Sequence, residues 1–351
     1  MSGFPQRLGL RGALRRLSRR RRSGGCALIL AYHRVGERLP SDPHALRVTP
    51  SSFSEQLTVL RRRWMPLRLE EIVSALHVGD LPPHAVVVTF DDGYADNLEC
   101  ATPLLERYDV PATVFITTGY LGGRREFWWD ELERILLHSA SLPATLTLTI
   151  GGRTRRWRVG SLRDGDARPP CAEPWNVEMR HAPTARHALY RALHPQLRPL
   201  EDTQRQAVLE QLRRWSGIDA GVRPTHRPLS VEELVRLAAG GRVDIGAHTV
   251  THPVLAALPV AAQQREIQAS KEQLEFLLGA PVNSFAYPYG SSQDYAQRTV
   301  ALVRAAGFAS ACANIPEPVW QGSDPYQLPR FLVRDWDGEE FSRRLRAWFH
   351  A

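Results

Sequence analysis

The chain has 351 residues, and its 45 Lys and Arg against 37 Asp and Glu give a formal net charge of +8. Eight arginines and no acidic residue lie in residues 1–25, so this segment carries the whole excess and the remainder is formally neutral. This distribution excludes a generally basic surface, and we expect no nucleic-acid partner. No apolar run approaches the ~20 residues of a membrane span. Four scattered cysteines without a CxxC spacing exclude a zinc ribbon and a disulfide framework.

Residues 1–23 form a basic N-terminal arm. Its arginines are accompanied by Leu8, Leu14 and Leu17, a weak apolar stripe that suits peripheral contact of residues 1–22 with an anionic membrane. A solvated tail is an equally good interpretation, and nucleic acid is a third one. The apolar run that follows is short and lacks a cleavage site, so we expect no signal peptide. We therefore predict a cytoplasmic protein whose arm would contact the inner face of the membrane.

Two acidic side chains follow the strand-like run at 86–90. This run of valines ends in Asp91 and Asp92, followed by Gly93. The carboxyl ends of buried parallel strands are where α/β enzymes present reactive groups. Adjacent carboxylates there are costly unless a positive charge compensates them. A polar turn is the competing interpretation of such a triplet.

A second cluster, His248-Thr249-Val250-Thr251-His252, follows the strand-like run at 242–246. One carboxylate and two neutral imidazoles are suitable ligands for a divalent metal such as zinc. The remaining carboxylate would then be free to accept a proton from water. Two histidines four residues apart also occur by chance, but here both clusters are expected at strand ends.

A third segment, Phe285-Ala286-Tyr287-Pro288-Tyr289-Gly290, completes a set of three motifs. With TFDDG at 89–93 and HTVTH at 248–252, it resembles the NodB-type polysaccharide deacetylases of carbohydrate esterase family four. The resemblance covers residues 26–125 and 225–340. It implies a general base at Asp91, an oxyanion donor at the backbone N–H of Tyr289, and a divalent metal, zinc or else cobalt or nickel, held by Asp92, His248 and His252.

The sequence departs from that family in two places. Ala286 stands where the common motif has an arginine that orients the catalytic aspartate; Arg330 of the later LPRF segment is a candidate replacement, although a structural ion pair is an equal alternative. The C-terminal motif with a catalytic histidine is not legible, since His350 lies at the chain end, where chains fray. The strand ending in Tyr32-His33 resembles a permuted branch of the family, which implies His33 as the general acid; a structural role is the alternative.

Alternating apolar strands and helical patterns predict an α/β fold, a distorted and incomplete (β/α) barrel. We expect the barrel at 24–125 and 225–351, with an inserted α+β lid at 126–224. Gly151-Gly152 within the insertion predicts a β-hairpin. Trp128 and Trp129 are candidates for stacking on sugar rings, or else an apolar plug against the core.

The sequence thus predicts a metal-dependent hydrolase that removes N-acetyl groups from amino sugars of a polysaccharide or a lipid-linked glycan precursor. Two other classes stay open. One is a catalytically silent carbohydrate-binding protein on the same scaffold, suggested by Ala286 and by the absent C-terminal motif. The other is a membrane-surface adaptor that acts through the basic arm.

Overall fold

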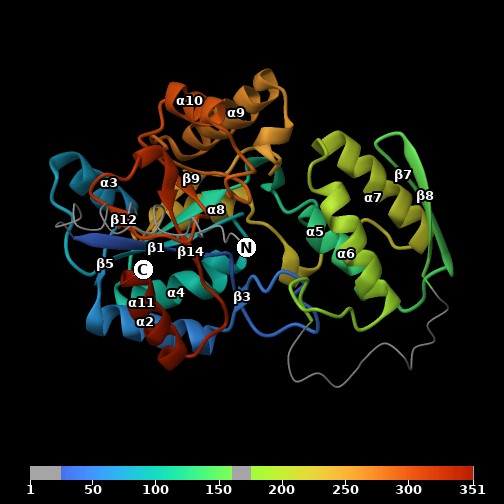
Figure 1. Cartoon of the computed structure of the whole chain (residues 1–351), viewed down its shortest axis with the longest axis horizontal. Coiled ribbons are helices and arrows are strands. Elements are labelled where there is room, and N and C mark those ends of the chain that lie inside the picture. Colours follow the sequence, from blue (N-terminus) through green and yellow to red (C-terminus); the bar gives the residue numbers. More distant parts are fainter. Residues whose placement is uncertain (1–24, 160–174, 351) are drawn as a thin grey trace, which may run out of the picture.

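The computed structural model describes residues 25–159 and 175–350 (Figure 1). The predicted basic arm, residues 1–23, therefore lies outside the described residues. Within the described ranges, no helix is both long enough and apolar enough to cross a lipid bilayer.

A parallel sheet forms the centre of the molecule. Its strands are rich in β-branched and small apolar residues and are largely buried on both faces, as expected for strands covered by helices. In spatial order they are β1 (Cys26–Tyr32), β5 (Ala85–Phe90), β6 (Ala112–Ile116), β9 (Val243–Ala247), β10 (Ser284–Ala286) and β11 (Ser310–Ala313).

The two edges of this sheet are joined by one short run. β13 (Leu328–Pro329) pairs with β11, and β14 (Phe331–Leu332) pairs with β1. The sheet therefore curls into a barrel whose closing strands are only two residues long. The predicted distorted α/β barrel is confirmed, and only two residue pairs on each side of this run join its edges. Two further short strands add to the sheet, β4 (Met65–Pro66) beside β5 and β12 (Val319–Trp320) beside β1.

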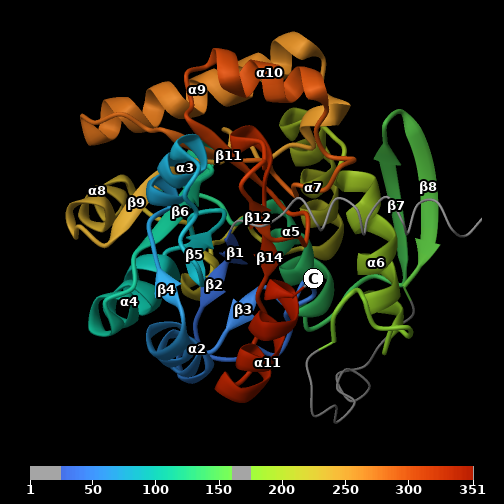
Figure 2. The same ribbon diagram turned by 60° about the vertical axis from the view of Figure 1, so that its left-hand side comes forward.

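Helices cover the outside of the barrel (Figure 2). Several begin at recognisable caps: the Thr49 hydroxyl accepts from the backbone N–H of Ser52, and Ser230 with Glu233 forms a capping box. These helices are α2 (Pro50–Arg63), α3 (Leu69–Val78), α4 (Thr102–Tyr108), α8 (Val231–Ala239), α9 (Val260–Leu278), α10 (Gln297–Ala305) and α11 (Gly338–Phe349). The short connecting elements are β2 (Arg34–Val35), β3 (Arg47–Val48), η1 (Asn97–Ala101), η2 (Thr118–Tyr120), η3 (Pro224–His226), η4 (Leu255–Ala257) and η5 (Pro325–Gln327).

A second body lies beside the barrel, between β6 and β9 in sequence (Figure 1). It contains α5 (Trp128–Leu137), β7 (Thr145–Ile150), β8 (Arg153–Arg158), α6 (Ala185–Leu197) and α7 (Asp202–Ser216). Its helices and hairpin share an apolar core of their own. The hairpin expected at Gly151-Gly152 is present, with φ of +56° and +75° at the two glycines, as a tight two-residue turn requires.

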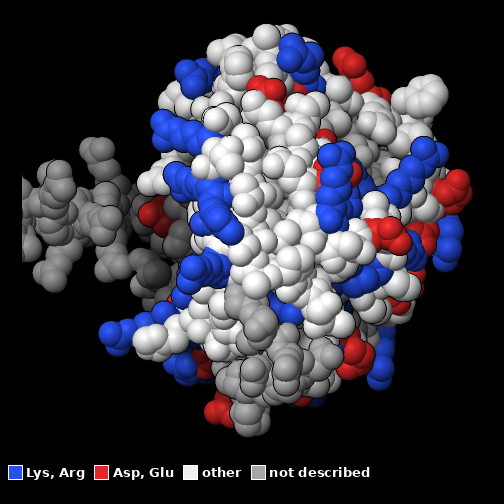
Figure 3. Space-filling view, turned by 90° about the vertical axis from the view of Figure 1, so that its right-hand side faces the viewer, with Lys and Arg blue, Asp and Glu red and all other residues white. Residues whose placement is uncertain are grey.

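The outer face of this second body carries charged side chains (Figure 3). β8 contributes exposed arginines, and basic side chains are spread over this side of the molecule with some acidic ones among them (Figure 3). The inner side faces the barrel, where the backbone N–H of Val177 donates to the carbonyl of Pro43 over 2.8 Å. The body therefore borders the end of the barrel at which the sequence motifs converge.

Candidate metal and catalytic site

Backbone strain is concentrated where the motifs meet. In the described part of the chain, seven non-glycine residues have positive φ, and four of them belong to the motifs: Asp92, Thr249, His252 and Tyr289. Such conformations are costly for L-residues and persist where the surrounding structure fixes them, often at functional sites. Gly93, with φ of +85°, completes the turn after β5; a Cβ there would lie 2.9 Å from the Ile116 side chain.

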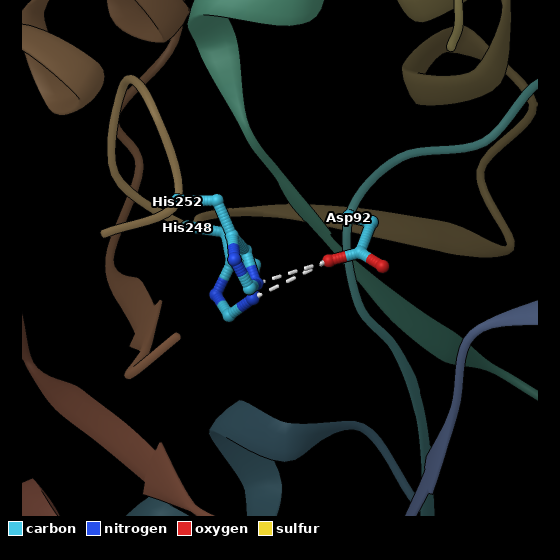
Figure 4. Close-up of side chains that lie close together, drawn as sticks. All are labelled: Asp92, His248 and His252. Atoms are coloured by element: carbon cyan, nitrogen blue, oxygen red, sulfur yellow. Dashed lines mark ion pairs between the residues drawn. The ribbon is translucent and has the colours of Figure 1, made fainter. Parts of the chain in front are cut away.

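Asp92, His248 and His252 point toward one another from two strand ends (Figure 4). Oδ1 of Asp92 lies 3.7 Å from Nε2 of His248 and 3.4 Å from Nε2 of His252. Ligands about 2.1 Å from a tetrahedral ion are separated by roughly 3.4 Å, so these spacings suit a shared metal. All three residues are buried.

The loop that carries the two histidines is held by the barrel and by α9. Nδ1 of His248 lies 2.7 Å from the carbonyl oxygen of Ala286, so this nitrogen donates and Nε2 keeps its lone pair for a metal. Glu266 of α9 accepts from the backbone N–H groups of Val250 and Thr251 at 2.8 and 2.9 Å. These contacts hold the loop in place through Ala286 and Glu266, which are not themselves candidate metal ligands.

The chemistry of the three residues fits a divalent cation. Burial, together with neighbouring Asp91, raises the pKa of Asp92 well above its usual value, so an ionised Asp92 needs a positive partner. Its Oδ1 atom is buried and accepts no hydrogen bond within the described residues. Burial also lowers the pKa of His248 and His252, which favours the neutral imidazoles that metals require.

Asp91 has a different environment. Its two oxygens each lie 2.7 Å from a terminal nitrogen of Arg330, which also donates to Thr89 and, through Nε, to Asn314. Burial raises the pKa of Asp91, but the Arg330 guanidinium together with His248 and His33 outweighs burial and lowers the pKa to about 2. Arg330 reaches this position from the strand run 328–332 that closes the barrel, and not from β10, where Ala286 stands.

His33 follows β1 and lines the same pocket as the two aspartates. Its Nδ1 has no hydrogen-bond partner within the described residues. Burial lowers the pKa of His33 to about 4 despite the opposing effect of Asp91, so the resting imidazole is neutral at neutral pH. His350 is exposed at the end of α11 and does not line this pocket.

The pocket has a volume of about 270 Å³ and lies between barrel and insertion. Tyr289 and Trp129 contribute to its wall. Trp128 does not: it is fully buried in the core of the second body, where its ring stacks on His194. The structure thus brings one of the two predicted tryptophans to the pocket.

Several pocket residues were not anticipated from the sequence. Asn314 joins the groups around the site, since its amide donates to the carbonyl of Tyr289 at 2.8 Å and accepts from Arg330. His44, His194, Arg198 and Arg334 line the outer part of the pocket. They lie in segments without a motif, and only the folded contacts identify them.

Comparisons with known proteins agree with this architecture. The family model described as polysaccharide deacetylase matches residues 79–142 and 211–311, and the break between the two matches falls within the insertion. A Streptococcus pyogenes deacetylase, PplD, solved in complex with acetate, superposes with a TM-score of 0.57 at 17% identity, covering 93% of this chain and 99% of that one. At that identity the likeness concerns the fold.

Two relatives are similar in sequence over shorter stretches. The Bacillus subtilis protein YxkH, named as a candidate polysaccharide deacetylase, is 28% identical over 140 residues, which are 39% of this chain and 48% of that protein. A poly-beta-1,6-N-acetyl-D-glucosamine N-deacetylase of Staphylococcus epidermidis is 30% identical over 108 residues, 27% of this chain and 37% of that enzyme. The chain thus matches about half or less of the length of these curated relatives. The family model thus matches on both sides of the insertion and the barrel fold agrees with it, so the chain is similar to the NodB-type polysaccharide deacetylases.

Proposed function

We propose that this protein is a metal-dependent deacetylase that hydrolyses N-acetyl groups on the amino sugars of a polysaccharide or a lipid-linked glycan precursor. The observation that carries the proposal is the division between the two aspartates. Asp91 is paired with Arg330, whereas Asp92 faces two neutral histidines, and all of them except Arg330 line one pocket.

Asp92, His248 and His252 would hold the divalent ion, with zinc, cobalt or nickel as candidates. When bound, the ion would polarise the acetamide carbonyl and lower the pKa of the attacking water. Asp91 then accepts the proton of that water. Arg330 keeps the Asp91 carboxylate ionised and fixes its orientation through two hydrogen bonds of 2.7 Å.

The backbone N–H of Tyr289 is the proposed donor to the oxyanion that forms on the acetyl carbon. Two features support it: the strained φ of +62° at Tyr289 and the hydrogen bond that fixes its carbonyl to Asn314. One such donor contributes roughly 3 kcal/mol to the transition state. Trp129 and Tyr289 would contact the sugar ring, since both line the pocket.

His33 is the proposed general acid. Because burial keeps it neutral at rest, it must gain a proton during the reaction, and the proton that Asp91 takes from the water balances this gain. The negative charge of the tetrahedral oxyanion would raise its pKa, since a nearby opposite charge favours the charged form. Protonated His33 then donates to the leaving nitrogen, the C–N bond breaks, and the products are acetate and a free amino sugar.

The substrate class rests on the relatives. One of them carries the name of an enzyme acting on poly-beta-1,6-N-acetyl-D-glucosamine, which supports an N-acetylated glycan as the partner of this pocket. The alternative of a silent binding protein was based on Ala286 and on the missing C-terminal motif. Arg330 supplies a guanidinium to Asp91 despite Ala286, so that ground for the alternative is lost.

Acetate release tests the proposal. Soluble oligomers of N-acetylglucosamine with different linkages and a lipid-linked N-acetylated glycan are incubated with the protein after zinc, cobalt or nickel addition. We expect acetate and free amine in equal amounts from at least one substrate, and a release rate lower by roughly 100-fold or more from the Asp91→Asn variant at equal metal content. No acetate from any member, with metal bound, would contradict the proposal.

A further inference from the structure

The two histidine ligands are supported in different ways. His248 donates from Nδ1 to the carbonyl of Ala286 at 2.7 Å, the usual second contact of a metal-binding imidazole. His252 has no such contact: its Nδ1 is buried without a hydrogen-bond partner within the described residues. Its backbone is also strained, with φ of +55°. Something other than a hydrogen bond must therefore set the direction of the His252 ring.

Aromatic rings pack on His252 from both bodies of the molecule. Trp129 of the insertion meets it at a centroid distance of 4.8 Å and an interplanar angle of 61°. Tyr289 of the barrel meets it at 4.6 Å and 76°. Both are edge-to-face arrangements, in which the positive edge of one ring meets the negative face of the other and fixes the relative orientation.

Trp129 is itself held rigidly. Its Nε1 donates to the hydroxyl of Tyr94 at 2.9 Å, and that hydroxyl donates to Asp130 at 2.6 Å. Phe127 stacks on Trp129 at 4.9 Å with an interplanar angle of 8°. Trp129 is only 5% exposed. A side chain with its polar atom bonded and its faces packed has one rotamer, so it can transmit a fixed position to its neighbour.

We propose that Trp129, held by Tyr94 and Asp130, is a positioning residue that orients metal ligand His252. The inserted body thereby helps to orient His252 by packing against its ring. The described residues of the barrel provide no hydrogen bond to Nδ1 of this histidine. This inference rests on the metal site of the proposed function but not on the substrate or the reaction. It also gives the FWWDE segment a role distinct from sugar binding.

Zinc affinity, measured by competition with a chromophoric chelator and without substrate, tests the proposal. In Trp129→Leu we expect the zinc dissociation constant to rise about 10-fold or more, the scale for lost support of a ligating histidine. Tyr94→Phe keeps the ring and removes the hydroxyl, and a smaller rise in the same direction is expected. The absorption spectrum of the cobalt-loaded protein should change in both variants, because it reports ligand geometry.

Trp215→Phe is the matched control. Trp215 belongs to the same insertion core and also uses its ring nitrogen, which donates to the carbonyl of Thr145 at 2.7 Å, but it does not line the metal pocket. This variant should lower the melting temperature without changing zinc affinity. If Trp129→Leu does not fold, the zinc affinities of Tyr94→Phe and Trp215→Phe are compared instead, and they decide whether Trp129 positions His252.

The outcomes separate this inference from the proposed function. Unchanged zinc affinity and cobalt spectrum in a folded Trp129→Leu or Tyr94→Phe protein would overturn the positioning role and leave deacetylation intact. Absence of acetate release, with zinc affinity still dependent on Trp129, would overturn deacetylation alone. A wild-type protein that binds neither zinc nor cobalt would overturn the inference as well.

Discussion

Two adjacent aspartates have opposite electrostatic environments. Burial raises the pKa of Asp91, but Arg330 together with His248 and His33 lowers it to about 2, whereas burial and Asp91 raise the pKa of Asp92. A carboxylate with its own guanidinium needs no metal to stay ionised. One without a guanidinium does, and this difference underlies the separate roles proposed for the pair.

The different environments of Asp91 and Asp92 predict different defects when each aspartate is replaced by asparagine. Asp91→Asn should retain near-stoichiometric metal and lose roughly 100-fold or more in rate, the scale of general-base loss. Asp92→Asn should lose metal affinity, because an amide replaces the anionic ligand. Metal content by elemental analysis, alongside acetate release, separates them; equal metal loss in both variants would show that the roles are assigned wrongly.

The ion pair between Asp91 and Arg330 gives a stability prediction. Both side chains are about 1% exposed. Removing one partner of a buried pair leaves an uncompensated charge, which costs about 3–5 kcal/mol of unfolding free energy. Arg330→Gln should therefore be strongly destabilising in urea denaturation with chelator present. Asp91→Asn combined with Arg330→Gln should be more stable than Arg330→Gln alone, and an additive loss would argue against direct coupling.

His33 is tested by the choice of leaving group. If it donates the proton to the amine, His33→Ala should keep metal and fold, lose most activity on an N-acetyl sugar, and lose much less on an activated acetyl ester whose leaving group departs unprotonated. Kinetics on both substrates measure this difference. Equal losses would indicate a structural role, and a selective defect in His350→Ala would move the acid to the C-terminus.

At the scale of elements, α6 and the loop before β3 meet through two half-buried histidines. His44 and His194 have ring centroids 4.4 Å apart. Burial, followed by Arg334 and Arg198, lowers the pKa of His44 to about 4, and burial with His44 lowers the pKa of His194 well below 6.5. Both are therefore neutral in the folded protein at neutral pH.

This contact predicts a loss of stability in acid. Between pH about 6.5 and about 4 the unfolded chain binds protons that the folded chain excludes, so the unfolding free energy falls as pH decreases through this window. His194→Gln should make that fall smaller, and the stability difference between variant and wild type should shift in favour of the variant as pH decreases. Urea denaturation of both proteins from pH 7 to 4.5, with chelator present, measures this change. Unfolding free energies that fall in parallel with pH in the variant and the wild type would contradict the prediction.

The motifs predicted from sequence are the ones encoded locally. Asp91, Asp92, His248 and His252 follow strand-like runs, and parallel strands bring their carboxyl ends together. Arg330 was only a candidate, because its position depends on the strand run 328–332 that closes the barrel between β11 and β1. Barrel closure is a long-range event that no local pattern indicates.

The two adjacent tryptophans also have positions that could be predicted only in part from the sequence. Trp128 and Trp129 are neighbours at the start of α5, and successive helical side chains point about 100° apart. Only one of them can face the pocket, and the sequence does not reveal which. Glu266 and Asn314 were missed for a different reason: each acts by hydrogen bonds to backbone groups far away in sequence, which carry no residue-type signal.

At the scale of the whole molecule, the charge excess of the sequence belongs to residues 1–22, outside the described ranges. Membrane contact through this arm and a cytoplasmic location stay predictions. Deleting residues 1–22 should leave hydrolysis of a soluble substrate unchanged and weaken binding to anionic vesicles, by about 1 kcal/mol for each basic residue at the surface. Vesicle sedimentation at two salt concentrations measures this; unchanged partitioning would exclude the arm as the membrane contact.

The barrel and the inserted body together make one site. The barrel carries the proposed metal ligands and the proposed base, while the insertion supplies Trp129 and part of the pocket wall. We therefore expect catalytic activity and metal occupancy at Asp92, His248 and His252 to change together.

A zinc titration of acetate release tests that expectation most directly. The protein is stripped of metal, and activity on the best N-acetylated oligosaccharide is measured as zinc is returned, with bound zinc determined in parallel. We expect negligible activity without metal and a rise that saturates at one ion per chain, and we expect that His248→Ala neither binds this ion nor recovers activity. Full activity in metal-free protein would contradict this expectation.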